Sequence, residues 1–467
     1  MKRLFALLLA LIMVAATLSA CGGKTEGKPA PQTQKEEEAN GPTPAPPIEG
    51  TVTISGEGKE DTPLTAETSV QNPLYQWYMD GEKLLHANSA TLQVPVNAAD
   101  KTITVAVTAE GYSGEIRSEG VVAVANPSDF KTMAGMYHAS KIVGRVFLDQ
   151  TDPTAAHIEW PACGFEFNVK ADGGPMKVYY KTTYESTLAV YVDGVKQERP
   201  IMVSAPRVLS FEIPLTAGDH TIKLLRELEP NTYPNQSQML TGIEFVGTVT
   251  EKPADKDLYI EFIGESTVTG SGSAGTFRPG AGFLVTDHSN TSSFAYQLAD
   301  QLNADYTIVA KGNMGFLNGD VGQNYNMPFV YDYWWRWSSE MPYKAERTPD
   351  LIIMKIGMND TEAAGHTLEG FKEGAKSFIG HLRELYGENV PIVWFDRINT
   401  GYPEQQYNAM LDLKTELSDE NLYITRFDWG LDGAGPATSS VGLARAENHK
   451  DIADQLAAYL KENGLVK

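Results

Sequence analysis

The sequence predicts a multidomain protein in which an N-terminal β-sandwich and a β jelly roll precede a doubly wound α/β domain. Residues 50–126 and 127–250 contain many short alternating β patterns separated by turn signals, which is typical of sandwiches and jelly rolls. Residues 256–467 instead alternate apolar strand patterns with helical patterns. That alternation predicts a parallel sheet covered by helices.

The composition fits globular domains and argues against a nucleic-acid partner. The chain has 467 residues, of which 42% are hydrophobic and 21% charged, and its formal net charge is −22. A chain this acidic is poorly suited to a nucleic-acid phosphate backbone. After residue 20, no stretch approaches the roughly 18 apolar residues that a transmembrane helix needs. We therefore expect a soluble exterior protein that acts on neutral substrates, with no nucleic-acid partner.

Residues 1–20 have the features of a secretory signal peptide: a basic start, an apolar stretch over 4–18 and small residues at the end. The run Leu18-Ser19-Ala20-Cys21 resembles a bacterial lipobox. This resemblance implies cleavage before Cys21 and attachment of lipid to its sulfur, and ordinary signal cleavage is the alternative. We expect an extracytoplasmic protein anchored to the bacterial cell membrane through Cys21.

Residues 21–49 are rich in Gly, Pro, Lys, Glu, Thr and Gln and poor in bulky apolar residues. They predict a disordered linker that tethers the globular part. If Cys21 carries lipid, Cys163 is the only thiol left, so no internal disulfide is expected. We interpret Cys163, in a Trp-Pro-Ala-Cys-Gly-Phe run, as a packed small residue.

The predicted sandwich at 50–126 includes the strand patterns 74–78 and 103–108, with Asp80-Gly81 as a hairpin turn signal. Trp77 in its strand and the later Gly111-Tyr112 resemble a bacterial Ig-like domain without the cysteine pair. Two roles are open for this domain, a spacer or a module that binds carbohydrate or cell wall.

The predicted jelly roll at 127–250 and the α/β domain at 256–467 are defined by their strand and helix patterns. The jelly-roll strands are expected at 164–169, 176–180, 188–192, 209–213, 218–224 and 240–245. The α/β strands are expected at 258–263, 306–310, 350–356, 391–396 and 421–426, and the helices at 291–303, 368–386, 403–418 and 446–463.

Polar, glycine-containing stretches follow the first three strands of the α/β domain. They are Gly264-Glu265-Ser266, Lys311-Gly312-Asn313 and Gly357-Met358-Asn359-Asp360. The carboxyl ends of parallel strands share one edge of the sheet, where ligands bind. We therefore expect these three loops to lie together.

The residue types in these loops fit ester hydrolysis. Ser266 can attack an ester carbonyl, and its N–H, the Gly312 N–H and the Asn359 amide can hold the oxyanion. One such donor is typically worth about 3–4 kcal/mol of transition-state stabilisation. Each piece alone has a plainer explanation, Gly312 as a turn glycine and Asn359-Asp360 as a helix cap. Their order on successive strand ends favours hydrolase chemistry.

The same stretches resemble the sequence blocks of the SGNH, or GDSL-type, hydrolases. Gly264-Glu265-Ser266 corresponds to the Gly-Asp-Ser block, Gly312 to the Gly block, and Gly357-x-Asn359-Asp360 to the Gly-x-Asn-Asp block. With the preceding jelly roll and Met327-Pro328, the chain over about 130–467 is similar to carbohydrate esterase family 2. The resemblance implies removal of O-acetyl groups from acetylated plant or cell-wall carbohydrate, with no cofactor.

The C-terminal block departs from the family pattern, which has a His-Pro pair and a second His six positions after the first. Leu443 and Ala444 stand where the His-Pro pair is expected, and His449 matches the second His. Asp432 is not in the usual place of the family Asp. A serine nucleophile needs an adjacent base, so either His449 swings in from the helix start or the site has no base.

Other candidate residues have weaker patterns. Trp334, Trp335 and Trp337 predict either a sugar-stacking wall beside the site or the buried side of a helix. The histidines lack the spacing of metal ligands and the chain has no Cys/His cluster, so no metal site is predicted.

We therefore expect a lipid-anchored carbohydrate O-acetyl esterase with Ser266 and His449 as catalytic residues. The alternative is a carbohydrate-binding lipoprotein with a degenerate, inactive esterase site, and the loss of the His-Pro pair together with its Asp favours weak or absent activity. The discriminating feature is whether a histidine reaches the Ser266 hydroxyl. A solute-capture lipoprotein is a third alternative, against which the position of the loops after the strands argues.

Overall fold

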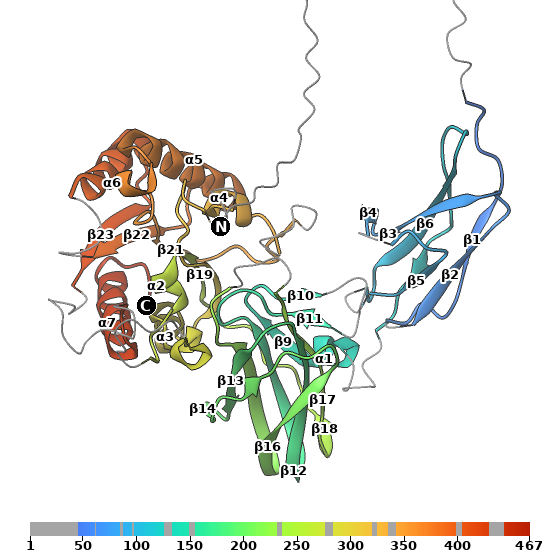
Figure 1. The fold of residues 1–467 in the computed structure, drawn as a ribbon, viewed down its shortest axis with the longest axis horizontal. Helices are drawn as coiled ribbons and strands as arrows, with labels where there is room; N and C mark the ends of the chain where they lie inside the picture. Colours follow the sequence, from blue (N-terminus) through green and yellow to red (C-terminus); the bar gives the residue numbers. More distant parts are fainter. Residues whose placement is uncertain are drawn as a thin grey trace, which may run out of the picture. The chain divides into compact units, whose positions relative to one another are not determined.

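The structure is a computed structural model with antiparallel β domains followed by a five-stranded parallel α/β domain, which confirms the predicted fold class (Figure 1). Cys21 and the predicted signal peptide lie outside the described residues. No helix in the described part of the chain is long and apolar enough to cross a membrane. The described residues are 45–60, 62–84, 87–95, 98–125, 133–148, 155–230, 236–275, 284–319, 325–334, 342–397, 404–428 and 443–467.

Two antiparallel sheets form the first β domain. Its strands are β1 Val52–Ser55, β2 Pro63–Thr68, β3 Pro73–Met79, β4 Glu82–Lys83, β5 Thr91–Gln93, β6 Thr102–Ala109, β7 Ile116–Arg117 and β8 Val121–Val122. The sheet orders are β1-β2-β5 and β4-β3-β6-β7, with β8 beside β6. Trp77 is fully buried. Asp80 and Gly81 have φ of 49° and 84° between the paired Met79 and Glu82, so the hairpin predicted from Asp-Gly is confirmed.

The second β domain is organised around two long strands. Its elements are α1 Met133–Ala139, β9 Ser140–Val143, β10 Phe147–Leu148, β11 Ala156–His157, β12 Gly164–Thr182, β13 Ser186–Val192, β14 Val195–Lys196, β15 Ile201–Met202, β16 Leu209–Arg226, β17 Gln238–Glu244 and β18 Gly247–Val249. The strand order is β10-β11-β17-β12-β16-β13-β14, with β9 and β18 on β12 and β15 on β13.

The sequence predicted two strands within each of the long strands β12 and β16, and that prediction was wrong. Gly173 and Gly174 lie between the two predicted strands 164–169 and 176–180. They have positive φ of 98° and 90°, yet Asp172 still pairs with Ala217 and Gly174 with Leu215. The glycines therefore bend β12 without ending it, because the ladder to β16 continues across the bend.

The α/β domain contains all five predicted strands and all four predicted helices. The strands are β19 Tyr259–Gly264, β20 Asp305–Ala310, β21 Leu351–Lys355, β22 Ile392–Arg397 and β23 Leu422–Phe427, all parallel in the order β20-β19-β21-β22-β23. The α-helices are α2 Ser266–Thr269, α3 Phe294–Gln301, α4 Met327–Val330, α5 Leu368–Tyr386, α6 Glu404–Leu417 and α7 Ala446–Glu462. Short 3-10 turns are η1 Val285–Asp287, η2 Asn290–Ser292 and η3 Glu362–Ala364.

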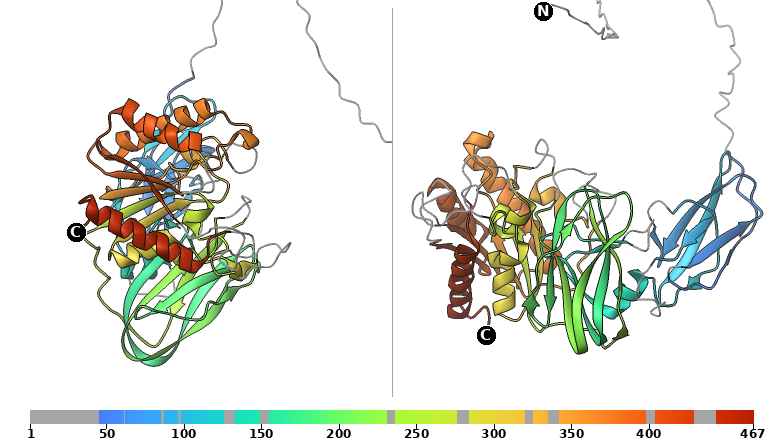
Figure 2. Two further views of the ribbon diagram at one scale, coloured as in Figure 1. Left: turned by 90° about the vertical axis from the view of Figure 1, so that its left-hand side faces the viewer. Right: turned by 60° about the horizontal axis from the view of Figure 1, so that its bottom comes forward.

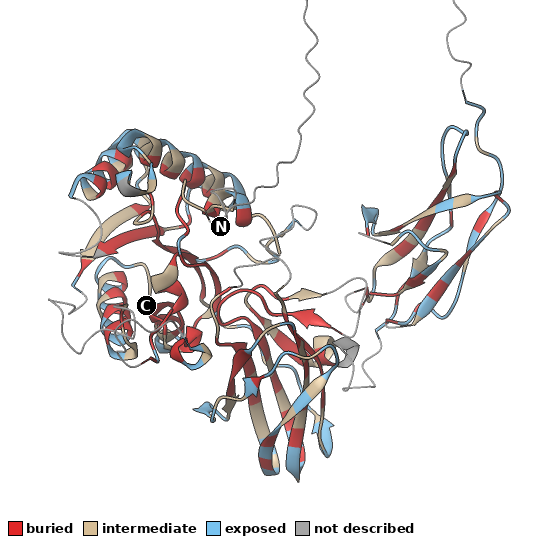
Figure 3. Ribbon diagram, in the orientation of Figure 1, coloured by how far each residue is buried: buried red, intermediate tan, exposed pale blue. Residues whose placement is uncertain are grey.

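Helices cover both faces of the parallel sheet, as two further views show (Figure 2). Successive side chains of β19 point to opposite faces. Phe262 packs with Phe294 of α3 and Leu456 of α7, whereas Ile263 lies in the cluster that contains Phe378 of α5. The central strands are therefore buried on both sides (Figure 3), as parallel strands between helical layers usually are.

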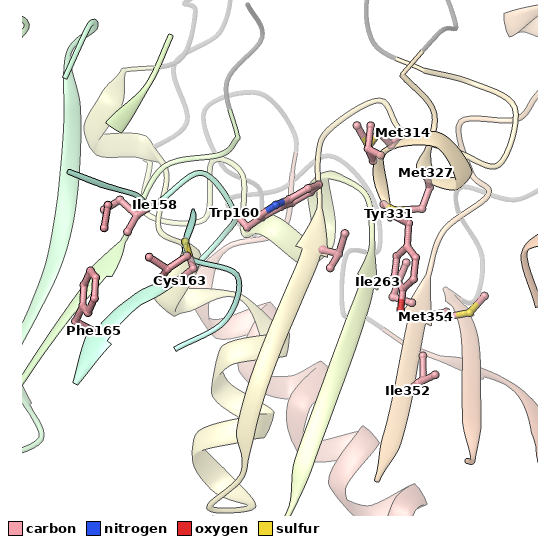
Figure 4. Close-up of a cluster of buried hydrophobic side chains, with 14 of the residues drawn as sticks. Ile158, Trp160, Cys163, Phe165, Ile263, Met314, Met327, Tyr331, Ile352 and Met354 are labelled. Carbon is pink, nitrogen blue, oxygen red and sulfur yellow. The ribbon is translucent and has the colours of Figure 1, made fainter. Parts of the chain in front are cut away.

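The cores of the second β domain and the α/β domain form one continuous cluster. Trp160 of the β domain is buried in the same hydrophobic cluster as Ile263 and Tyr331 of the α/β domain (Figure 4). Its Nε1 donates to the Trp334 carbonyl at 2.9 Å. This shared core lets side chains of the β domain reach the loops of the α/β domain at fixed positions.

Candidate active site at the carboxyl edge of the parallel sheet

The three predicted loops meet at one edge of the sheet. Gly264, the last residue of β19, is in register with Ala310 of β20 and Lys355 of β21. The Lys311 N–H donates to the Gly264 carbonyl at 3.2 Å. A Cβ on Gly264 would lie 2.3 Å from the Lys355 carbonyl oxygen, so only glycine lets the strands approach this closely. The loops that follow these strands therefore start side by side.

Ser266 is the first residue of α2 and is half-buried. Glu265 is the N-cap of this helix, and its carboxylate accepts a hydrogen bond from the Thr267 N–H at 3.2 Å. The same carboxylate accepts the Ser266 hydroxyl at 2.6 Å. The proton of the predicted nucleophile is therefore directed to the neighbouring carboxylate.

Glu265 is an ionised carboxylate and a weak proton acceptor. It is fully buried, and Lys355 Nζ, itself 2% exposed, lies 3.2 Å from its Oε1. Burial alone would raise the pKa of Glu265. Lys355 and the hydrogen bonds from Ser266 and Thr267 outweigh burial and lower that pKa. A carboxylate with a lowered pKa is poorly matched to the role of general base near neutral pH.

His449 lies in the first turns of α7 and is 1% exposed. Its Nδ1 accepts the Phe294 N–H at 3.3 Å, and its ring stacks on the Phe294 ring with centroids 6.2 Å apart. Burial lowers the pKa of His449 to about 4, although the charge of Glu265 opposes this shift. Among the described residues, the Ser266 hydroxyl donates to Glu265 and not to His449. The assignment of His449 as the base stays a prediction.

The Gly312 N–H, a predicted oxyanion donor, is engaged by a residue that the sequence analysis did not identify. It donates to Oε1 of Glu229, which comes from the second β domain. Lys311 Nζ lies 3.3 Å from the same oxygen, and the Ser271 hydroxyl donates to Oε2. Burial would raise the pKa of Glu229, but Lys311 and Ser271 outweigh it and lower that pKa. The carboxylate is therefore ionised beside the loop of Gly312.

Glu229 also affects the pKa of a second histidine, His288. Burial lowers the pKa of His288, which is 8% exposed, and the charge of Glu229 partly opposes that shift. Glu229 follows β16 in the sequence Arg226-Glu-Leu-Glu229, a charged stretch between the β-strands β16 and β17. Local patterns do not indicate which distant loop such a side chain contacts, so no sequence signal pointed to its role.

Asn359 and Asp360 hold the loop that follows β20. The Asn359 amide donates to the Met314 carbonyl at 2.8 Å, and its second amide hydrogen can still serve a ligand. The Asp360 carboxylate accepts the N–H groups of Phe316, Leu317 and Asn318 at 2.7, 3.0 and 2.7 Å. Burial raises the pKa of Asp360, and these three hydrogen bonds oppose the shift. Asp360 and Asn359, both on the loop after β21, thus hold the neighbouring loop that follows β20.

Solved structures share this architecture, whereas no family model and no curated protein matches the sequence. A family 2 carbohydrate esterase from Clostridium thermocellum in complex with cellohexaose is 19% identical, with a TM-score of 0.62 over 70% of this chain and 100% of that chain. An acetyl xylan esterase from the rumen bacterium Butyrivibrio proteoclasticus is 20% identical, with a TM-score of 0.60 over 71% and 96%. A family 2 carbohydrate esterase from Cellvibrio japonicus is 15% identical, with a TM-score of 0.60 over 70% and 95%.

The chain has the fold of the family 2 carbohydrate esterases. At 20% identity or less, this likeness establishes the fold and leaves the chemistry to the residues of the site. The segment of Leu443 and Ala444 is placed next to the loop after α2, because the Ala446 N–H donates to the Ser273 carbonyl at 3.1 Å. A side chain at position 443 is thus on a segment that borders the Ser266 helix.

Trp334 is half-buried and its described contacts lie away from the Ser266 loop. Its ring meets Tyr343 edge to face with centroids 4.6 Å apart, and its carbonyl accepts from Trp160. Arg145 lies over the Tyr343 ring and pairs with buried Glu261. The other two members of the predicted stacking wall, Trp335 and Trp337, lie outside the described residues.

A cleft of about 750 Å³ lies between the second β domain and the helices α3 and α7. Its lining includes Tyr191, Lys223, Tyr296, Asp300 and Glu447. Ser266, Gly312, Asn359, Trp334 and His449 are not among its lining residues. The cleft is therefore separate from the predicted catalytic residues.

The described residues hold no arrangement of three or more His, Cys, Asp or Glu side chains that could bind a metal ion. Cys163 is a buried free thiol, and burial raises its pKa to about 12. A thiol that stays protonated is unreactive, which agrees with its interpretation as a packed small residue.

Proposed function

We propose that this protein binds acylated carbohydrate at the Ser266 edge and has no efficient ester hydrolysis of its own. The observation that carries this proposal is the partner of the Ser266 hydroxyl, which donates to Glu265 at 2.6 Å. A serine hydroxyl is a weak nucleophile unless an adjacent base takes its proton. Glu265 has a lowered pKa, and the Nδ1 of His449 is engaged with the Phe294 N–H.

Carbohydrate as the ligand is supported by the fold and by the donors of the site. One solved relative of this fold holds cellohexaose. Another, 18% identical with a TM-score of 0.57, is a carbohydrate esterase whose active site displays divergent catalytic and non-catalytic binding functions. In this chain, the second amide hydrogen of Asn359 can donate to the carbonyl of an acyl group.

Active ester hydrolysis is the second candidate function. It is favoured by the position of Ser266, half-buried at the start of a helix directly after β19, with Asn359 on the loop after the neighbouring β21. This candidate requires His449 to leave its contact with Phe294 and reach the Ser266 hydroxyl.

Calorimetric titration of the mature protein with matched acetylated and deacetylated xylo- and gluco-oligosaccharides tests the proposal. We expect tighter binding of the acetylated forms, and Asn359→Ala should remove that preference. Tyr191→Ala, in the separate cleft at α3 and α7, should leave it unchanged. Absence of binding, or loss of binding in Tyr191→Ala alone, contradicts the proposal. If the wild type releases acetate rapidly and Ser266→Ala abolishes this release, the second candidate function, active ester hydrolysis, is established instead.

We also propose that the protein is an extracytoplasmic lipoprotein anchored through Cys21. The lipobox-like run Leu18-Ser19-Ala20-Cys21 supports this location.

A further inference from the structure

Residues 227–229, which follow β16, form a rigid arm that reaches from the second β domain to the α/β domain. The guanidinium of Arg226 is fully buried and donates to the Leu228 carbonyl at 2.7 Å and to the Glu229 carbonyl at 2.8 Å. It also donates to the Ile158 carbonyl at 2.7 Å. These bonds fix the backbone from which the Glu229 side chain projects.

The arm is also bound to the α/β domain, through Glu227. The carboxylate of Glu227 is fully buried and accepts the Thr291 N–H at 2.9 Å and the Thr291 hydroxyl at 2.8 Å. The Ser289 hydroxyl donates to the same carboxylate at 3.1 Å. The segment that carries Glu229 is therefore bound both to the second β domain, through Arg226, and to the α/β domain, through Glu227.

The Glu229 carboxylate fills a pocket of donors beside Ser266. Gly312 N–H and the Ser271 hydroxyl donate to its two oxygens, and Lys311 Nζ lies 3.3 Å from Oε1. A Cβ at position 312 would lie 2.2 Å from that oxygen, so glycine permits the approach. Ser271 lies on the turn that follows the helix of Ser266, because its N–H donates to the Ser266 carbonyl at 3.2 Å.

We propose that Glu229 is an internal occupant of the oxyanion pocket of this site. Its carboxylate oxygen takes the Gly312 N–H that would otherwise stabilise the developing charge on an ester oxygen. The inference rests on the proposed function in one respect, the binding of an acyl group at the Ser266 edge, where Gly312 is the predicted oxyanion donor. It adds a second reason for slow hydrolysis, independent of the missing base, and it assigns the pocket a ligand class, small carboxylates.

Direct binding of sodium acetate to Glu229→Ala tests this inference without any catalytic readout. Removal of the side chain leaves the Gly312, Lys311 and Ser271 donors without their anion. We expect saturable acetate binding by Glu229→Ala at constant ionic strength. The wild type, Glu229→Gln, which keeps the pocket filled, and Glu212→Ala, which removes an exposed carboxylate of β16, should bind none. A folded Glu229→Ala without acetate binding overturns the inference.

The Gly312 amide proton gives a second measurement if Glu229→Ala does not fold. An N–H that donates to a carboxylate resonates downfield, and Glu229→Gln should move the Gly312 resonance upfield by removing the charge. Sequential backbone assignment of the wild type identifies that resonance. An unchanged Gly312 resonance in folded Glu229→Gln overturns the inference.

Activity in a background with a restored base separates this inference from the proposed function. In Leu443→His/Ala444→Pro, added Glu229→Ala should raise kcat for a chromogenic acetate about 10²-fold, the usual effect of one oxyanion donor. Added Glu212→Ala should not. No gain with Glu229→Ala in an active background contradicts the inference. Failure of the proposed function has a different signature, the absence of oligosaccharide binding by the wild type, and the acetate titration decides the role of Glu229 in either case.

Discussion

At the scale of single residues, the site keeps its carboxylates charged and its imidazole neutral. Glu265 and Glu229 each have a lysine partner, Lys355 and Lys311, and both carboxyl pKa values are lowered. His449 is buried, which lowers its pKa to about 4. The charges are thus arranged for a stable folded site and supply no strong proton acceptor at the Ser266 hydroxyl.

The pH dependence of stability tests the environment of His449. Its folded pKa of about 4 is below its ordinary value of 6.5, so the unfolded chain binds the proton more readily. Between about pH 6.5 and about pH 4 the wild type should lose up to about 3 kcal/mol of unfolding free energy that His449→Gln does not lose. Denaturant unfolding at neutral pH and at about pH 4.5 measures this difference. A stability gap between the two proteins that does not change with pH contradicts the assignment.

The candidate residues that follow strands could be predicted from the sequence, whereas their partners could not. Ser266, Gly312 and Asn359 each follow an apolar strand, and parallel strands place such loops at one edge. The hydrogen bond of the Ser266 hydroxyl depends on a rotamer and on the depth of Lys355, which no pattern encodes. Glu229 belongs to another domain, and its contact with Gly312 arises only when the two domains pack.

At the scale of elements, the arm after β16 ties the second β domain to the α/β domain. Arg226 fixes the arm to its own domain, and Glu227 docks on the turn at Ser289 and Thr291. Buried carboxylates are stable only where each is paired with donors. Because the partners of Glu227 are Ser289 and Thr291 and those of Glu229 are Gly312 and Ser271, Glu227 serves in docking and Glu229 acts at the site.

Glu227→Ala should lower the free energy of unfolding by about 3 kcal/mol, because it leaves the donors of Thr291 and Lys196 without their buried acceptor. Glu212→Ala, an exposed carboxylate on β16, should change it by less than about 0.5 kcal/mol. Denaturant unfolding of the three proteins checks both values. Equal stability of the two variants would show that Glu227 does not hold the arm.

The element boundaries that the sequence predicted best are those in the α/β domain. Leu368–Tyr386 begins and ends where its apolar periodicity does, because each such helix covers the sheet with one apolar face. The sequence predicted two strands, 164–169 and 176–180, where the structure has the single strand Gly164–Thr182. Pairing with a distant strand joins the two, and such pairing is not visible in a local pattern.

At the scale of the whole molecule, the β domains and the esterase-like domain lie on one chain behind a lipobox-like N-terminus. The second β domain contributes both core side chains and the Glu229 carboxylate to the α/β domain. It is therefore part of the site and not only a neighbour of it.

Membrane fractionation tests the proposed anchor. Cys21→Ser removes the thiol that would carry the lipid, so the full-length protein should move from the membrane fraction to the soluble fraction. Ala20→Gly, which keeps a small residue before the cysteine, should stay in the membrane fraction. Retention of Cys21→Ser in the membrane fraction would show that lipid on this cysteine is not the anchor.

The proposal that Ser266 has no efficient base is tested most directly by acetate release from a chromogenic acetate. We predict that the rate of the wild type is close to that of Ser266→Ala, and that Leu443→His/Ala444→Pro raises the rate about 10²–10⁴-fold, the usual contribution of a general base. Adding Ser266→Ala to that variant should abolish the gain. Fast wild-type turnover that requires Ser266 and His449, with no gain from Leu443→His/Ala444→Pro, would show that Ser266 already has an efficient base.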